Sequence, residues 1–194
     1  MPPHLGNCEW PRIRTQFAQT LNVERPPVTQ IVRASQEHVP TIAELAGVIW
    51  RACYPKIINR EQIEYMLSRM YALRILREEI RSKEIRYELL MVDGKPVGFA
   101  SYGPALEAGV MKLHKLYVLP ELHGCGLGSR LLQHCEGEIR AAGAKHLILS
   151  VNKRNAKAIA AYKRNGFVVA DAVVTDIGGG FVMDDYIMAK DLPE

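Results

Sequence analysis

A glycine-rich stretch at residues 123–129, HGCGLGS, separates a run typical of a β-strand from a run typical of an amphipathic helix. Glycine adopts positive φ and has no Cβ, so this stretch can turn tightly from a strand into a helix. Backbone N–H groups at the start of that helix, together with the helix dipole, can converge on one anion. The stretch therefore predicts a strand–loop–helix unit of an α/β fold, which is either a phosphate cradle or a plain turn.

Two common nucleotide-binding loops do not fit this stretch. A P-loop requires Gly-Lys-Ser/Thr at the start of the helix, whereas this chain has Gly128-Ser129-Arg130. A Rossmann loop requires a third glycine, and counting from Gly124 that position is Ser129. Antiparallel strands are also expected before the loop, which disfavours dinucleotide binding as well as ATP hydrolysis.

Apolar periodicity predicts one domain over residues 28–194, after an irregular, proline-rich extension over residues 1–27. Helices are expected at residues 40–54, 60–82, 127–139 and 156–164. Strands are expected at residues 29–33, 87–92, 96–102, 111–118, 147–151, 167–174 and 184–189. The helix over residues 60–82 should be continuous, because its apolar residues form one stripe.

The connections between these elements predict a mixed sheet. Asp93-Gly94 is a hairpin signal, so the strands on either side should be antiparallel neighbours. A helix connects the strand at 111–118 to the strand at 147–151, so these two should be parallel, with a right-handed crossover. Helices should then flank the sheet.

Composition narrows the class of protein further. The chain has 194 residues, of which 48% are hydrophobic, enough for one buried core. Its formal net charge of +4 is scattered along the sequence, so no nucleic-acid partner is expected. No apolar run is long enough to span a membrane, and the four cysteines show no C-x-x-C pair and follow no secretory signal. We therefore expect a cytoplasmic protein with no metal site.

Two motifs together resemble the GNAT superfamily of N-acetyltransferases. The run LHKLYVLPELHGCGLG, residues 113–128, is similar to strand four of that family and its Q/R-x-x-G-x-G/A coenzyme A loop. The run LSVNKRNAKAIAAYKRNGF, residues 149–167, is similar to its N-x-x-A-x-x-x-Y-x-x-x-G-F signature. The resemblance covers residues 86–190, while residues 29–82 agree only in their order of strand and helices. It implies a single-domain GNAT fold in which parallel strands four and five splay apart.

The resemblance implies acetyl-coenzyme A as the cofactor. That family has Gln or Arg where this chain has His123, so one charge-assisted contact to the pyrophosphate becomes weaker or dependent on pH. Arg130 either replaces that contact or is a solvated helix residue. The cofactor-binding residues that the resemblance implies are Leu116, Tyr117, Val118, His123, Gly124, Cys125, Gly126, Leu127, Gly128, Ser129, Asn152, Asn155 and Tyr162.

The resemblance also implies how the acetyl group is transferred. The N–H of Val118 would face the acetyl oxygen, where one well-placed donor is worth about 3 kcal/mol. Asn155 would contact the pantetheine arm, cap the helix that it begins, or do both. Tyr162 would donate a hydrogen bond to the departing sulfur, unless it only packs in the core. Proton transfer from a phenol (pKa ~10) to a thiolate (~8.5) is uphill by about 2 kcal/mol, which favours the hydrogen bond.

The attacking amine must lose a proton, because an alkyl amine with a pKa near ~10.4 is protonated at neutral pH. His114 is the predicted base, with a water chain as the alternative. Its ordinary pKa near ~6.5 suits proton relay, and strand alternation places it on the face of Leu116 and Val118. Residues 112–118 are also similar to strand four of serotonin N-acetyltransferases, which implies the same role. The alternative interpretation is a packed or surface histidine.

The sequence predicts the acceptor less closely than the cofactor. In the family that it resembles, the acceptor contacts the first two helices and the central strands, which makes Tyr54, Tyr65 and Tyr102 the predicted substrate residues. Glu61 is a further possible contact there, and Asp176, Asp184 and Asp185 near the terminal strands could attract a cation, although such residues are more often solvated. We expect a small-molecule amine as the acceptor. The amine should attack acetyl-coenzyme A directly, because no base adjoins Cys125 to make it a nucleophile that carries the acetyl group. A noncatalytic acyl-coenzyme A sensor is the alternative, and a homodimer is left open.

Overall fold

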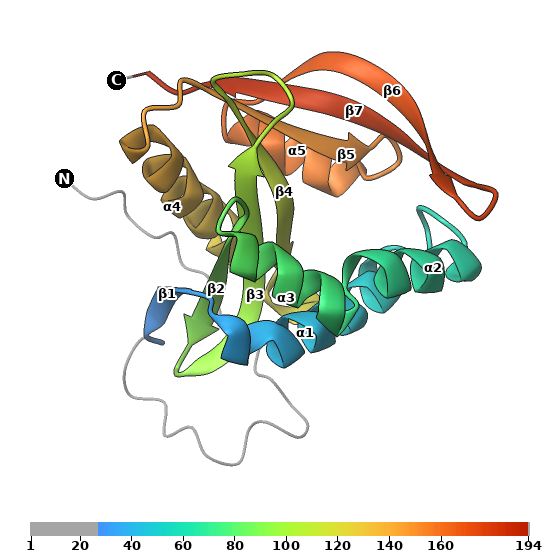
Figure 1. Cartoon of the computed structure of the whole chain (residues 1–194), viewed down its shortest axis with the longest axis horizontal. Helices are drawn as coiled ribbons and strands as arrows, with labels where there is room; N and C mark the ends of the chain where they lie inside the picture. The colour runs from blue at the N-terminus through green and yellow to red at the C-terminus, as the bar shows by residue number, and fades with distance from the viewer. Residues whose placement is uncertain (1–26, 194) are drawn as a thin grey trace.

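A seven-stranded mixed sheet runs through the computed structural model, which describes residues 27–193 (Figure 1). The strand order is β1-β2-β3-β4-β5-β7-β6. The strands are β1 (Thr29–Arg33), β2 (Arg86–Val92), β3 (Lys95–Pro104), β4 (Val110–Val118), β5 (His146–Asn152), β6 (Val168–Gly178) and β7 (Phe181–Asp191). The helices are α1 (Val39–Cys53), α2 (Arg60–Met70), α3 (Leu73–Ser82), α4 (Leu127–Ala141) and α5 (Ala156–Arg164), with short 3-10 turns η1 (Gln36–His38) and η2 (Pro120–Leu122). Apart from Pro27, the predicted N-terminal extension lies outside the described residues.

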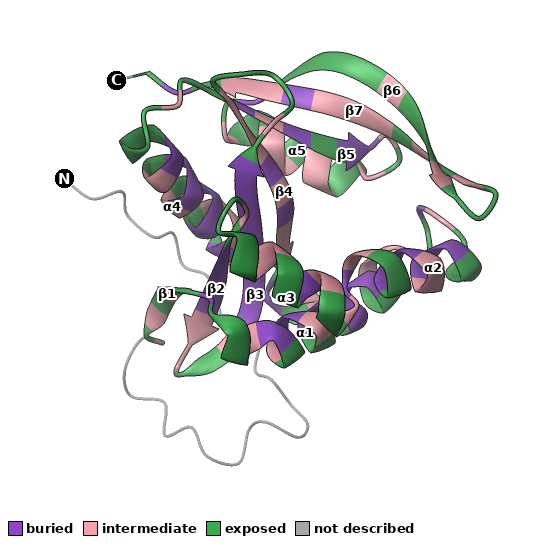
Figure 2. Ribbon diagram, viewed as in Figure 1, coloured by how far each residue is buried: buried purple, intermediate pink, exposed green. Residues whose placement is uncertain are grey.

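Helices cover both faces of the sheet, as the sequence predicts (Figures 1 and 2). Helices α1, α2 and α3 pack on one face around an apolar cluster that includes Trp50, Leu76 and Phe99. Helices α4 and α5 pack on the other face around a second cluster that includes Leu131 and Met188. Among the helices of residues 27–193, none is long and apolar enough to cross a membrane.

The predicted strand directions around the central sheet are confirmed. Strands β2 and β3 are antiparallel. Asp93 and Gly94 between them have φ values of 47° and 75°, the left-handed conformation that a two-residue hairpin requires. Strands β4 and β5 are parallel and are connected through helix α4.

The single helix predicted over residues 60–82 is wrong, because the chain breaks into α2 and α3. Ala72, between them, has φ of −56° and ψ of 136°, which is not helical. Tyr71 packs edge-on against Trp50, with 5.9 Å between ring centroids, and only 4% of it is exposed. The break brings both Tyr71 and Leu76 into the same apolar cluster. Neither Gly nor Pro marks it, and an apolar stripe alone does not reveal a change of helix direction.

Strands β6 and β7 extend beyond their predicted bounds, residues 167–174 and 184–189, and end in a turn that is seated on helix α2. Gly178, Gly179 and Gly180 in this turn have φ of 83°, 65° and 79°. A Cβ on Gly178 would stand 2.7 Å from the Tyr65 hydroxyl, and one on Gly179 would stand 2.9 Å from the Tyr65 ring. Glycine therefore allows both the turn and its close approach to α2.

Candidate cofactor and acceptor site

Strands β4 and β5 pair only over their first halves. The parallel register runs from Val110 opposite His146 to Leu113 opposite Leu149 and then stops. Beyond that point β4 stays paired with β3 up to Val118, while β5 stays paired with β7 up to Asn152. The two strands thus diverge into a wedge, in agreement with the splayed strands that the family resemblance implies. Leu116, Tyr117 and Val118 lie on one side of the wedge, and Asn152 lies on the other.

The glycine-rich loop connects β4 to α4 and adopts the conformation that the sequence predicts. Gly124 and Gly126 have φ of 85° and 75°, and no atom lies within 4 Å of where their Cβ atoms would stand. Gly126 is also the N-cap of α4, which receives no hydrogen bond from a capping side chain. The side chain of Leu127 is 4% exposed, so its backbone, rather than its side chain, can meet a ligand. Amide groups at the start of α4 are consequently available to an anion.

Side chains on either side of this loop fix its position. His123 Nε2 lies 2.8 Å from the carbonyl oxygen of Val118, to which a protonated Nε2 donates. Asn165 Nδ2 donates to Ser129 Oγ at 3.1 Å, which ties the end of α5 to the start of α4. The Arg130 guanidinium donates to the carbonyl of Thr29 at 3.1 Å. His123 thus holds the loop against the end of β4, and Arg130 contacts the β1 backbone.

Helix α5 presents two of the residues that the sequence predicts at the cofactor. Asn155 Oδ1 accepts a hydrogen bond from the N–H of Ala158 at 3.2 Å, so Asn155 is the N-cap. The ring of Tyr162 packs edge-on against Phe167, with 5.7 Å between centroids. Within residues 27–193 the Tyr162 hydroxyl has no hydrogen-bond partner. Burial raises the pKa of Tyr162 to about 12, so this hydroxyl keeps its proton at neutral pH.

Three phenols gather near the wedge. Burial raises the pKa of Tyr54 well above its ordinary value, and the neighbouring Tyr117 and Tyr162 raise it further. Burial likewise raises the pKa of Tyr117, with a smaller effect of Tyr162. Tyr54 stacks on Trp50, with 4.3 Å between centroids and 7° between planes. The predicted substrate residue Tyr54 therefore lies with the predicted cofactor residues Tyr117 and Tyr162.

His114 lies at an irregularity of β4 that simple alternation does not anticipate. Leu113 is opposite Tyr102 and Lys115 is opposite Ser101, so His114 is an extra residue without a partner on β3. Such a bulge re-aims side chains and is frequent near active sites. The alternation used to place His114 on the face of Leu116 is therefore interrupted at His114 itself.

The surroundings of His114 disfavour its charged form. Its Nε2 is buried and has no hydrogen-bond partner among the described residues. Burial, followed by the charges of Lys115 and Lys112, lowers the pKa of His114 to about 4. Lys115 is itself only 4% exposed and forms an ion pair with Glu79 at 2.8 Å. His114 is thus neutral at physiological pH and able to accept a proton, although it is a weak base.

The two other predicted substrate tyrosines have internal partners. The Tyr65 hydroxyl donates to the carbonyl of Ile177 at 2.7 Å and so holds the β6–β7 hairpin on α2. Tyr102 is 1% exposed, and its hydroxyl donates to Glu88 Oε1 at 3.2 Å. Neither hydroxyl is gathered with Tyr54 and Tyr162.

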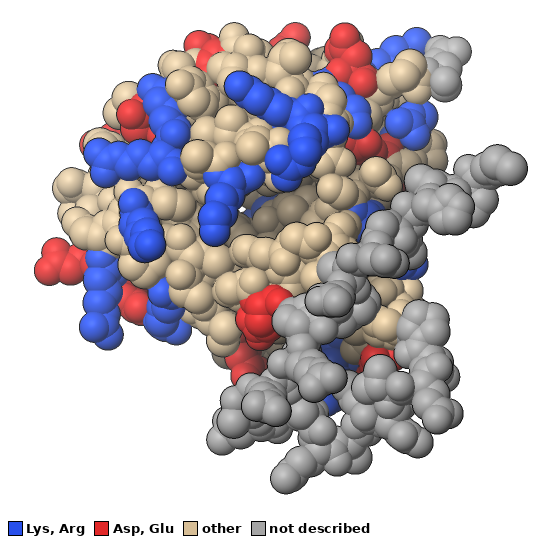
Figure 3. All heavy atoms as spheres, turned by 180° about the vertical axis from the view of Figure 1, so that it is seen from behind, with Lys and Arg blue, Asp and Glu red and all other residues tan. Residues whose placement is uncertain are grey.

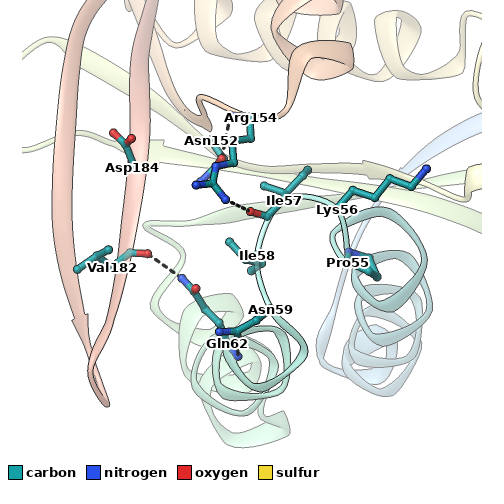
Figure 4. A pocket seen from close by; sticks show the side chains of 10 residues that line it. All are labelled: Pro55, Lys56, Ile57, Ile58, Asn59, Gln62, Asn152, Arg154, Val182 and Asp184. Atoms are coloured by element: carbon teal, nitrogen blue, oxygen red, sulfur yellow. Dashed lines mark hydrogen bonds between the residues drawn. The ribbon is translucent and has the colours of Figure 1, made fainter.

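A pocket of about 500 Å³ lies beside the loop between α1 and α2 (Figure 4). It is lined by residues 55–59, Gln62, Asn152, Arg154, Val182 and Asp184. Asn152 ends β5, so the pocket adjoins the wedge. Sequence reasoning missed residues 55–59, Gln62, Arg154 and Val182 as site residues. Only Arg154 gave a signal, as part of the basic pair directly before Asn155.

The acidic residues near the pocket differ in their partners. Asp184 lines the pocket and forms an ion pair with Lys153. Asp185 Oδ1 is buried without a hydrogen-bond partner among the described residues. Burial and the charge of Asp184 raise the pKa of Asp185. Glu61 and Asp176 are exposed.

A basic surface accompanies the signature segment. Residues 139–170 contain seven Lys or Arg residues and no Asp or Glu. Figure 3 shows the side of the molecule opposite to Figure 1, where Lys and Arg side chains lie above and to the left of a hollow. Such a concentration of positive charge favours the approach of an anionic ligand.

Known proteins share this fold and these motifs. A sequence model of the GNAT acetyltransferase family matches residues 45–167. The chain is 28% identical over 159 residues to a spermidine N(1)-acetyltransferase of Thermoplasma acidophilum, covering 80% of this chain and 95% of that protein. The crystal structure of PaiA N-acetyltransferase from Thermoplasma acidophilum in complex with coenzyme A has a TM-score of 0.74 at 28% identity, covering 84% of this chain and 99% of that one.

A more distant structure shows the fold alone. The ribosomal-protein-S18-alanine N-acetyltransferase of Escherichia coli has a TM-score of 0.66 at 21% identity, covering 86% of this chain and 96% of that one. The family match, over more than half of the chain, supports a definite assignment. The chain belongs to the GNAT family of acetyltransferases, enzymes that use acetyl-coenzyme A as the acetyl donor.

Proposed function

We propose that this enzyme transfers the acetyl group of acetyl-coenzyme A directly to the amine of a small molecule. The observation that supports this best is the Tyr162 hydroxyl. It has no partner within residues 27–193 and lies with Tyr54 and Tyr117 near the wedge between β4 and β5. A donor at that position is suited to a sulfur that becomes negatively charged.

Backbone groups would hold the cofactor. Acetyl-coenzyme A supplies the thioester that the amine attacks. Gly124 and Gly126 leave open space, and the uncapped start of α4 offers amides and a positive helix end to the pyrophosphate. Leu116, Cys125, Gly128 and Asn152 complete the proposed cofactor contacts.

Two donors would stabilise the charge that develops during transfer. The N–H of Val118 faces the acetyl oxygen in this proposal, and the Tyr162 hydroxyl faces the sulfur. With the pKa of Tyr162 at about 12, full transfer of its proton to a thiolate of pKa ~8.5 is uphill by about 5 kcal/mol. Tyr162 therefore acts as a hydrogen-bond donor, and the thiolate takes its final proton from solvent or from the amine.

His114 is the proposed acceptor of the amine proton, either directly or through water. Its neutral state allows this, and the orphaned, buried Nε2 has capacity for one more hydrogen bond. A pKa of about 4 makes His114 a weak base, so its contribution should lie at the lower end of the usual range for general bases, about a hundredfold or less.

The pocket beside the α1–α2 loop is the proposed acceptor site, and Tyr54 directly precedes its lining residue Pro55. Tyr65 would act there by holding the β6–β7 hairpin that supplies Val182 and Asp184. The relative named for spermidine makes polyamines one class of amine to test.

Two measurements test the proposal. Calorimetry should detect binding of acetyl-coenzyme A and of coenzyme A, and a thiol reagent should detect coenzyme A released in the presence of an amine library. Tight cofactor binding without turnover on any amine would instead support a noncatalytic acyl-coenzyme A sensor. No binding of either cofactor form would reject both functions.

A cytoplasmic location and a homodimer are also part of the proposal. The first rests on the cysteine pattern of the sequence, and the second rests on the family. Cell fractionation and light scattering test them.

A further inference from the structure

Several hydrogen-bond acceptors that line the pocket already have donors. Asn59 Oδ1 accepts from the N–H of Gln62 at 2.7 Å, and the carbonyl of Val182 accepts from Gln62 Nε2 at 2.7 Å. Asn152 Oδ1 accepts from the N–H of Arg154 at 3.0 Å. These contacts hold the walls of the pocket in place, and they occupy acceptors that a ligand with donors of its own would otherwise use.

The charged residues that line the pocket also offer little to a cationic ligand. Asp184, the only acidic residue among those that line it, is paired with Lys153. A cationic ligand must therefore compete with Lys153 for that carboxylate. An ammonium group bound elsewhere in the pocket would also meet the positive field of Arg154 and its basic neighbours.

Arg154 brings the main unused donors. Figure 4 shows its side chain extending from the start of α5 into the pocket, towards Ile57. One nitrogen lies 3.5 Å from the carbonyl oxygen of Ile57, the outer limit of a hydrogen bond, and no acidic side chain pairs with it among the described residues. A guanidinium has five N–H donors in a planar fork whose geometry matches a carboxylate.

We infer that Arg154 binds a carboxylate of the acceptor, so that the acceptor is an amine that also carries a carboxylate, such as an amino acid. The inference rests on the proposed function, which places the acceptor in this pocket.

A matched set of amines tests this inference. 4-Aminobutyrate, butylamine and 1,4-diaminobutane share four carbons but end in a negative, neutral and positive group; alanine and alaninamide form a shorter pair. The wild-type enzyme should acetylate 4-aminobutyrate and alanine, the two amines that carry a carboxylate. Their kcat/KM should be about tenfold or more above that of their neutral or cationic analogues. A cationic analogue that is acetylated faster than its acid would overturn the inference.

Two variants assign the effect to one side chain. Arg154→Ala should lower kcat/KM for the acids about tenfold and leave the neutral amines nearly unchanged, while Arg154→Glu should favour the diamine. Arg164→Ala removes the same charge from the exposed far end of α5 and should leave the order of the amines unchanged. If Arg154→Ala instead weakens coenzyme A binding and leaves the order of amines unchanged, Arg154 belongs to the cofactor site and the inference is wrong.

A binding measurement keeps the test independent of turnover. N-acetyl-4-aminobutyrate and N-acetylalanine resemble the products and should bind the wild-type enzyme in complex with coenzyme A. They should bind the same complex of Arg154→Ala about tenfold more weakly. Equal binding to both would reject the role of Arg154. Absence of turnover on every amine, with this product binding intact, would reject the proposed function and leave the carboxylate site standing.

Discussion

The proposed cofactor side and the proposed acceptor side of the wedge are built in different ways. On the cofactor side, a short continuous segment supplies backbone amides, and glycines at Gly124 and Gly126 set its shape. On the acceptor side, the pocket takes its walls from the α1–α2 loop, from α2, from the end of β5 and from β7. The first depends on local backbone conformation, and the second depends on side chains that the complete fold brings together.

This difference determines how each side should respond to substitution. A backbone site tolerates a change of side chain but fails when its φ angles are no longer accessible. A site made of side chains loses one contact with each substitution. It can therefore change which acceptor it prefers while the neighbouring site still binds the cofactor. Cofactor binding and acceptor preference should therefore respond to different substitutions.

Removing the hydroxyl of Tyr162 should give the largest effect, because in the proposed function that group donates to the departing sulfur where the two sides meet. Tyr162→Phe should lower kcat about a hundredfold by removing a donor to the sulfur. Coenzyme A affinity, measured by calorimetry, should change about twofold or less, since a neutral hydrogen bond contributes little to ground-state binding. An unchanged kcat would show that Tyr162 only packs against Phe167.

A substitution in the glycine-rich loop should distinguish the two sides most clearly, because it should affect coenzyme A binding and not acceptor preference. Gly126 has φ of 75°, which costs an alanine about 1–2 kcal/mol, so Gly126→Ala should weaken coenzyme A binding about tenfold. Gly137→Ala is the matched control, because it lies within the same helix and its Cβ would meet no atom within 4 Å. That control should be neutral or stabilise α4 by about 0.5–1 kcal/mol. Equal losses in both variants would contradict a backbone cradle.

The buried histidine of β4 predicts a dependence on pH. The pKa of His114 is about 4 in the folded protein and ~6.5 in an unfolded chain, so the unfolded state takes up the proton first as pH falls. The free energy of unfolding should decrease between about pH 6.5 and about pH 4. His114→Gln should remove this part of the decrease, which urea denaturation at several pH values will measure.

The same variant tests catalysis. If His114 accepts the amine proton, His114→Gln should lower kcat/KM about ten- to a hundredfold and alter the acidic limb of its pH profile. An unaltered acidic limb would assign proton removal to water instead.

The smallest effect is expected at the hairpin contact of α2. Tyr65→Phe removes the hydrogen bond to Ile177, worth about 1 kcal/mol, and should lower kcat/KM for the acceptor about fivefold by loosening the wall that includes Val182. Coenzyme A affinity should not change. Tyr102→Phe removes one hydroxyl from a central strand and serves as the comparison. An equal loss there would show that the acceptor site also depends on Tyr102.

Sequence patterns predicted the backbone of the glycine-rich loop and the start of α5 well for a physical reason. Positive φ at Gly124 and Gly126 and the cap at Asn155 are local properties, and local properties leave residue types at fixed spacing. The hairpin at Asp93 and Gly94 was predictable on the same grounds.

The remaining features depend on tertiary packing. The break at Ala72 follows from the burial of Tyr71, and the bulge at His114 follows from register with β3, so neither has a local marker. The internal partners of Tyr65 and Tyr102 likewise come from distant parts of the chain. A tyrosine in a sequence does not reveal whether its hydroxyl will face a ligand or a carbonyl group.

The seating of the glycine turn on Tyr65 joins residues separated by 112 positions in the chain. During synthesis on the ribosome, the loop at residues 123–129 emerges well before Val182 and Asp184. A growing polypeptide can therefore assemble the cradle early, but it gains a complete acceptor pocket only when its last hairpin docks.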